Sequence, residues 1–239
     1  EFGLRDSDCW VVGFAAEFKV SFQRLNEVAY ILARGGQVLG ECGPILGGYA
    51  GGPEGVAVVS TAYLLYSILI LRASAHLTFP LHMRGWNSSQ QLLWTQSLST
   101  QAISRNTHLP QLWYTYCAAG PMTEMNLYEI AAGMISGVVS GGNIEFGGVG
   151  AARNMDHLSP LEPRFATEVA HAAAGMGRQE ANEIVRKLVV QYQDRLFDPP
   201  KGVPFQQNHD WDSIQPCSEY ADLYGRIKDE LRGYGLPLS

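Results

Sequence analysis

The sequence lacks both a basic patch and a metal-binding cysteine pattern. Its longest run of positive charge is the pair Arg186-Lys187, and its net charge is -6 with a pI near 5.5. Proteins that bind nucleic acid or anionic membranes through charge display a basic surface, so we expect neither as a partner. The 4 cysteines are widely spaced and form no C-x-x-C pair. This spacing indicates neither a disulfide framework nor a zinc site, and favours reduced thiols in a cytoplasmic protein.

The sequence also shows no pattern typical of a targeting segment or of a membrane-spanning segment. Residues 1–10 contain no basic segment followed by an apolar one, so no signal peptide is expected. The most apolar segment, 56–71, contains Ser60, Thr61 and Ser67. It falls short of the roughly 20 apolar residues that cross a bilayer, and we expect a buried helix instead.

Familiar catalytic motifs are absent too. The sequence has no G-x-S-x-G and no H-E-x-x-H, which excludes the commonest hydrolase classes. A glycine-rich loop at 47–52 opens a helix, and such loops can bind phosphate through backbone N–H groups. This loop lacks the Lys-Ser/Thr of a P-loop, which favours a tight turn. An α/β enzyme that binds phosphate here remains a weaker alternative.

What the sequence does contain is an alternation of short strand-like and longer helix-like segments. With 46% hydrophobic positions among 239 residues, it can form a sizeable core. The alternation predicts four βα units around a parallel sheet over residues 1–121. We expect strands at 10–14, 37–42, 77–83 and 112–118, and helices at 22–34, 56–71, from 87–89 to about 105, and after Thr123. Residues 122–239 are expected to form the last helix of these units and a helical C-terminal extension, with a surface connector at 198–205.

Four βα units cannot close a barrel by themselves. A closed (β/α)8 barrel needs eight strands and about 250 residues. Three completions are therefore open: an upstream half of the same protein, a second copy, or an open doubly wound sheet that is complete in itself. In the first two cases the sheet would expose edges and apolar residues such as Val11, Val38 and Leu81, and the isolated chain should not be a compact monomer.

Five residues near the expected strand ends could carry chemistry. The carboxyl ends of parallel strands meet at one edge of a sheet, where ligands bind. Glu41 ends the second strand between apolar neighbours, where a partly desolvated carboxylate can act as acid, base or hydrogen-bond acceptor. His82 and Arg84 alternate at the end of the third strand, and Tyr114 and Tyr116 alternate on the fourth, so each pair should point to one side.

Several ordered segments resemble a known family. They are Glu41 to Glu54 (ECGPILGGYAGGPE), Ser74 to Arg84 (SAHLTFPLHMR), Ala119 to Met125 (AGPMTEM) and Glu168 to Met176 (EVAHAAAGM). Together they resemble the monomethylamine methyltransferases of methanogens, and the similarity runs from about Glu17 to a matching tail at 233–236.

The resemblance implies a fold, an activity and partners. The fold would be the C-terminal half of a (β/α)8 TIM-type barrel followed by a helical region, assembled into a homo-oligomer. The activity would be transfer of a methyl group from a small methylated amine to the Co(I) of a corrinoid (cobalamin), which a partner protein carries; this chain would bind no cofactor or metal. The family's pyrrolysine would lie shortly before Glu1, in an upstream half.

The resemblance also implies roles for residues. A family glutamate falls on Glu41 and a site tyrosine on Tyr116, which we predict to be catalytic. A second family glutamate falls on Val11, and a family glutamine falls on Tyr114. We predict that Tyr114, together with His82 and Arg84, binds substrate. The two departures leave two alternatives open: a divergent, pyrrolysine-free relative that acts on another N-methyl compound, and a non-catalytic binding or assembly module.

Overall fold

A five-stranded parallel sheet forms the framework of the chain. The computed structural model describes residues 5, 8–13, 18, 21–149 and 154–238. The strands are β1 (Cys9–Gly13), β2 (Gln37–Cys42), β3 (Ala75–Thr78), β4 (Gln111–Cys117) and β5 (Asn143–Val149), and they lie side by side in chain order. An open doubly wound sheet reverses its strand order. The observed order does not reverse, so the described residues do not form such a sheet.

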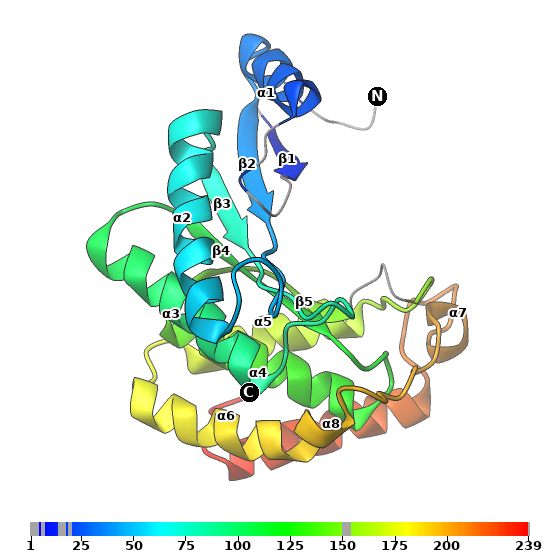
Figure 1. Cartoon of the computed structure of the whole chain (residues 1–239). Helices are drawn as coiled ribbons and strands as arrows, with labels where there is room; N and C mark the ends of the chain where they lie inside the picture. The colour runs from blue at the N-terminus through cyan, green and yellow to red at the C-terminus, as the bar shows by residue number, and fades with distance from the viewer. Residues whose placement is uncertain (1–4, 6–7, 14–17, 19–20, 150–153, 239) are drawn as a thin grey trace.

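Helices connect the strands and lie along one side of the sheet, whereas the other side is open (Figure 1). The connecting helices are α1 (Phe22–Ala33), α2 (Pro53–Leu71), α3 (Gln90–Asn106) and α4 (Glu124–Val139). The predicted caps of α3 and α4 are confirmed. The Ser89 hydroxyl accepts a hydrogen bond from the Leu92 N–H, and the Thr123 hydroxyl accepts one from the Asn126 N–H, which satisfies free donors of each first turn.

Alternation along β4 separates the two faces of the sheet. Trp113, Thr115 and Cys117 are buried against the helices, whereas Tyr114 and Tyr116 are only half-buried on the opposite face. We call this opposite face the helix-free face, since no helix of the described residues covers it. Side chains of a strand point alternately to its two sides, so Glu41 of β2 shares this face while Val38 and Gly40 turn toward the helices.

The C-terminal helices pack around α4. They are α5 (Leu161–Ala173), α6 (Arg178–Tyr192), the 3-10 turn η1 (Gln193–Arg195), α7 (Phe205–Asn208) and α8 (Ser218–Gly233). The helix α4 contacts α3, α5, α6 and α8, and its residues from Met125 to Gly137 are all buried. The main hydrophobic core therefore lies on the helix side of β4 and β5, and a smaller one lies between β1, β2 and α1.

The long apolar helix α2 packs along β2 and β3. By length and composition alone, it is the one helix of the described residues that could cross a membrane, with a mean hydropathy of 1.8. Its buried positions include Ser60 and Ser67, and the Ser67 hydroxyl bonds His76 Nδ1 of β3 at 2.7 Å. These contacts are those expected of a helix in a βα unit.

Three sequence predictions need correction. Residues 143–149 form a fifth strand, although the region after Met122 was expected to be helical. The third strand covers Ala75–Thr78 and not 77–83, because Pro80 lacks the N–H that would continue the ladder. Val38 is fully buried against α1 and α2, since it points to the helix side. Phe14, the expected end of the first strand, lies outside the described residues.

Candidate active site

Glu41 is the central carboxylate of the helix-free face. It lies near the carboxyl end of β2, where its backbone pairs with Gly13 of β1 and Leu77 of β3. The side chain is half-buried, and burial raises the pKa of its carboxyl group above the ordinary value. Removing water makes the negative charge costly, so a cation that approaches Glu41 would be bound more strongly than at an exposed carboxylate.

Three aromatic rings lie together on the same face. Tyr114 and Tyr116 stack with ring centroids 4.2 Å apart and an angle of 29° between the ring planes. The Phe79 ring, just beyond β3, lies 5.4 Å from Tyr116 and 6.4 Å from Tyr114. Burial and then the nearby charge of Glu41 raise the pKa of Tyr116 to about 12. Both phenols stay protonated at neutral pH, since burial also raises the pKa of Tyr114.

Two buried amides fix the backbone of these tyrosines. Beyond the end of β3, Asn87 takes the place of a strand residue: its Oδ1 accepts from the Tyr116 N–H at 2.7 Å, and its Nδ2 donates to the Tyr114 carbonyl at 3.0 Å. Gln96 of α3 donates to the Thr78 and Tyr114 carbonyls at 3.1 and 3.3 Å. Neither amide was predicted from the sequence, where the only indication was the cap-like Asn-Ser-Ser at 87–89.

A buried glutamate of α4 holds the end of β4. Glu129 accepts hydrogen bonds from the N–H groups of Ala118 and Ala119 at 2.6 and 2.9 Å, and from the Ser88 hydroxyl at 2.5 Å. Its carboxylate thereby joins the loop after β4 to the loop before α3. We interpret Glu129 as a positioning residue, because it is fully buried and its carboxylate bonds the backbone of the loop after β4.

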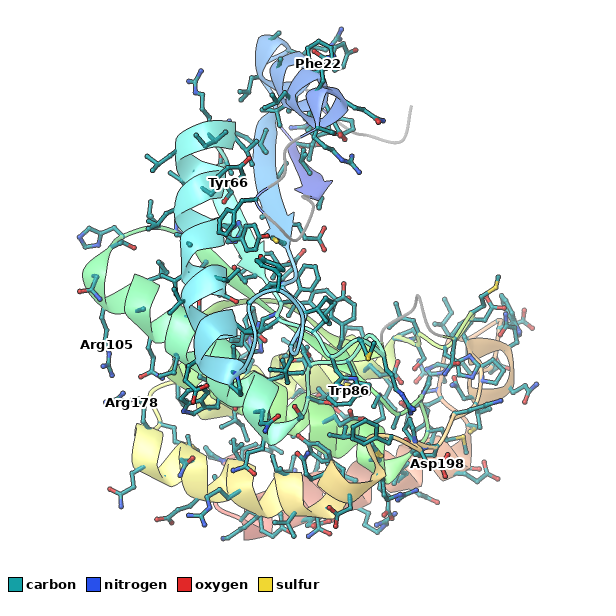
Figure 2. The ribbon with its side chains drawn as sticks, in the orientation of Figure 1. Phe22, Tyr66, Trp86, Arg105, Arg178 and Asp198 are labelled. Atoms are coloured by element: carbon teal, nitrogen blue, oxygen red, sulfur yellow. The ribbon has the colours of Figure 1, made fainter. Side chains whose placement is uncertain are left out.

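His82 and Arg84 lie beyond the end of β3, in the turn that follows Pro80. The His82 ring stacks on Trp86 with centroids 4.2 Å apart, and Arg84 Nη1 donates to the Phe197 carbonyl at 2.7 Å. The Phe197 ring also packs edge-on against both His82 and Trp86. Figure 2 places Trp86 near Asp198, in the segment after η1. The expected strand-end placement of this pair is therefore wrong, and their substrate-binding role stays a prediction.

A second carboxylate, Glu145 of β5, also interacts with the site. Its pKa is raised by partial desolvation and by the charge of Glu41, and its own charge contributes to the raised pKa of Tyr114 and Tyr116. Sequence reasoning missed Glu145 because it missed β5. On β1, at the position where the resemblance implies a glutamate, Val11 is 52% exposed.

Metal-binding residues do not cluster in the described part of the chain, where no group of three or more His, Cys, Asp or Glu could hold an ion. The fold and the site define the chain as an α/β protein whose polar groups gather on the helix-free face of a parallel sheet. The family model for the monomethylamine methyltransferase MtmB matches residues 1–236, and the chain belongs to this family.

Individual relatives agree with this membership. The chain is 32% identical to the monomethylamine methyltransferases MtmB2 of Methanosarcina barkeri and MtmB of Methanosarcina mazei, with 98% of this chain and 52% of each relative covered. The crystal structure of the Methanosarcina barkeri monomethylamine methyltransferase superposes with a TM-score of 0.92 at 31% identity, over 95% of this chain and 50% of that chain. A crystal structure of the hydroxylamine complex of MtmB gives the same values. The chain spans about half the length of the curated relatives it matches.

Proposed function

We propose that the chain is the C-terminal half of a (β/α)8 barrel and acts within a methyltransferase. Two observations support the half-barrel. The strands follow chain order with every connecting helix on one side, which is the arrangement along the wall of a barrel. In addition, β1 and β5 are both sheet edges, where further strands could pair.

The proposed reaction passes a methyl group from a small methylated amine to the Co(I) of a corrinoid carried by a partner protein. The observation that carries this proposal is the half-buried carboxylate of Glu41 beside two protonated phenols, in a chain of the MtmB family. We propose Glu41 and Tyr116 as the catalytic residues and Tyr114, His82 and Arg84 as substrate-binding. We further propose a cytoplasmic homo-oligomer that includes the upstream half.

The chemistry explains why these groups suit the task. When the methyl group leaves nitrogen, the bonding electron pair stays on nitrogen, so the amine must carry positive charge beforehand to depart as a neutral molecule. Glu41 would hold the ammonium and favour its charged form, and Tyr116 would orient it by hydrogen bonding. The aromatic rings would exclude water from the reacting carbon and contribute cation–π attraction.

A cobalt methylation assay tests the proposal. Native full-length protein, a Co(I) corrinoid protein and a methylated amine are mixed, and the absorption change of the corrinoid on methylation is followed. Glu41→Gln should lower the rate by about 100-fold or more, because it removes the charge that the substrate cation meets. Glu183→Gln on the exposed surface of α6 is the matched control and should keep the rate. Absence of cobalt methylation with mono-, di- and trimethylamine would contradict the proposal.

A second candidate function is a binding or assembly module without turnover. The observation in its favour is Val11, an exposed apolar residue on β1 where the resemblance implies a carboxylate. Calorimetry separates the two functions. A module would bind methylated amines without methylating cobalt. A divergent enzyme would bind an N-methyl compound and also transfer its methyl group to cobalt.

A further inference from the structure

The strand ladder beside Tyr114 and Tyr116 is incomplete. The strand β3 ends at Thr78, and its pairing with β4 stops at Leu112. In the described part of the chain, the rest of β4 pairs with β5 on one side but with no strand on the side of β3. Backbone groups that are shielded from water need hydrogen-bond partners. On this side the two tyrosines must therefore be bonded by something other than a strand.

Asn87 supplies the missing bonds. Its backbone N–H donates to the Tyr116 carbonyl at 3.0 Å, its Oδ1 accepts from the Tyr116 N–H at 2.7 Å, and its Nδ2 donates to the Tyr114 carbonyl at 3.0 Å. The residue is only 1% exposed. One residue thus satisfies three backbone groups of β4, which are groups that a neighbouring parallel strand would otherwise bond.

The two side-chain bonds require an amide at this position. The Tyr116 N–H can only donate and the Tyr114 carbonyl can only accept, so one end of the side chain must accept while the other donates. Gln96 reinforces this orientation, because its Oε1 accepts from Asn87 Nδ2 at 3.3 Å while its Nε2 donates to the Tyr114 carbonyl at 3.3 Å. A carboxylate would offer acceptors only and would face the Tyr114 carbonyl with a negative charge.

Fixed segments hold Asn87 on both sides. Before it, the His82 N–H donates to the Trp86 carbonyl at 2.8 Å, and the rings of these two residues stack. After it, the Ser88 hydroxyl donates to the buried carboxylate of Glu129. The amide is therefore anchored independently of the strand that it bonds, so it can determine where that strand lies.

We propose that Asn87 is a positioning residue for methyl transfer, whose amide sets the place of the Tyr114 and Tyr116 rings relative to Glu41. This inference rests on the proposed function and adds a residue to its site. Asn87 acts through the tyrosines, because its amide atoms are engaged by the backbone of β4 and by Gln96. Misplacing a reacting group by about 1 Å can lower a rate by about 100-fold.

Replacing the amide by an acid tests the requirement for a donor. In Asn87→Asp the ionised carboxylate would face the Tyr114 carbonyl, whereas the protonated acid would donate to it as the amide does. Cobalt methylation by the native full-length protein and the variant is followed between about pH 5 and 8, a range above the ordinary aspartate pKa, which burial would raise. At the alkaline end the variant should lose about tenfold or more in kcat. Its KM for methylammonium should stay within about threefold of native, because Glu41 and both rings are still present.

Lower pH should restore the variant. The ratio of variant to native kcat should rise by about threefold or more toward the acid end, as the new acid takes up its proton. Taking this ratio removes the titration of Glu41, which both proteins share. The control Asn182→Asp adds an acid at an exposed position of α6, so its ratio should not change with pH. A merely structural role would lower the melting temperature and leave the kcat of the folded variant at the native value.

The proposal is overturned if folded Asn87→Asp keeps the native kcat at the alkaline end, or if its kcat ratio does not change with pH. Should Asn87→Asp not fold, Gln96→Glu removes the second donor to the Tyr114 carbonyl and decides by the same ratio.

A native protein that methylates no cobalt would remove the proposed activity but would still leave this inference testable. Crystal structures of the native protein and of Asn87→Asp at the alkaline end then decide. The Tyr114 and Tyr116 rings, stacked with centroids 4.2 Å apart, should be displaced in the variant. An unchanged stack would overturn the positioning role of Asn87.

Discussion

At the scale of single residues, the site depends on how each ionisable group is surrounded. Glu41 could be selected from the sequence because it ends a recognisable strand between apolar neighbours, and the half-buried position with a raised pKa agrees with that environment. Asn87 and Gln96 could not be selected. Their role is to bond the backbone of β4, and a polar residue in a loop or on a helix carries no sign of which distant carbonyl it will reach.

The Tyr116 ring should contribute more to cation binding than its hydroxyl. Tyr116→Leu removes the ring beside Glu41 and should weaken the binding of methylated ammonium ions by about three- to thirtyfold, the range of cation–π attraction at partly desolvated sites. Tyr116→Phe keeps the ring and should stay close to the native affinity. Calorimetric titration compares them, with Tyr30→Leu on the exposed side of α1 as control. Equal losses in the Phe and Leu variants would assign the effect to the hydroxyl.

His76 should make the fold sensitive to acid. Its ring is buried between Ser67 and Thr78, with both nitrogens bonded at 2.7 Å, and burial lowers its pKa to about 3. Below pH 6.5 the His76 ring takes up a proton in the unfolded chain but stays neutral in the folded chain. His76 therefore lowers the free energy of unfolding by up to about 1.4 kcal/mol for each pH unit, until the pH reaches the folded-state pKa.

Urea unfolding of the native protein between pH 7 and 4 measures this slope. His76→Gln should show a shallower fall in unfolding free energy with decreasing pH, even though it is less stable at pH 7. His108→Gln, at an exposed position after α3, is the control and should keep the native slope. An unchanged slope in His76→Gln would refute the assignment.

At the scale of secondary structure, the sequence predicted those elements whose pattern is local. The strand at 37–42 and the starts of α3 and α4 agree with the structure because alternation and capping residues fix them nearby. The strand β5 was missed because glycines precede it at 141–142 and recur within it at 147–148, a composition more typical of loops. Its identity comes from pairing with β4, a distant segment.

Close packing of α4 on β4 should depend on two glycines of α4. A Cβ atom on Gly133 would lie 2.2 Å from Thr115 Oγ1, and one on Gly137 would lie 2.6 Å from the Trp113 ring. Gly133→Ala should destabilise the protein by about 1–3 kcal/mol through overpacking. Gly225→Ala in the middle of α8 meets nothing within 4 Å and should stabilise by about 0.5–1 kcal/mol. The denaturant midpoints of the two variants measure these changes in stability. Equal changes in Gly133→Ala and Gly225→Ala would contradict close packing at Gly133.

At the scale of the whole molecule, the parallel sheet leaves surface that a complete barrel would cover. Val11 is 52% exposed, and both edge strands offer backbone groups for pairing. We predict that the purified 239-residue chain associates through its sheet edges or needs the upstream half. Light scattering checks this: a monodisperse, cooperatively melting monomer of 26.2 kDa would contradict the half-barrel.

On the proposed function, Glu41 and its neighbours on the helix-free face bind the ammonium group of the substrate. A crystal structure of the native full-length protein with methylammonium tests it most directly. The account predicts ligand density on this face, with the nitrogen at about 2.7–3.2 Å from a carboxylate oxygen of Glu41 and the methyl group near the Tyr116 ring. Ligand bound away from Glu41, for example in the groove between α3 and α6, would contradict it.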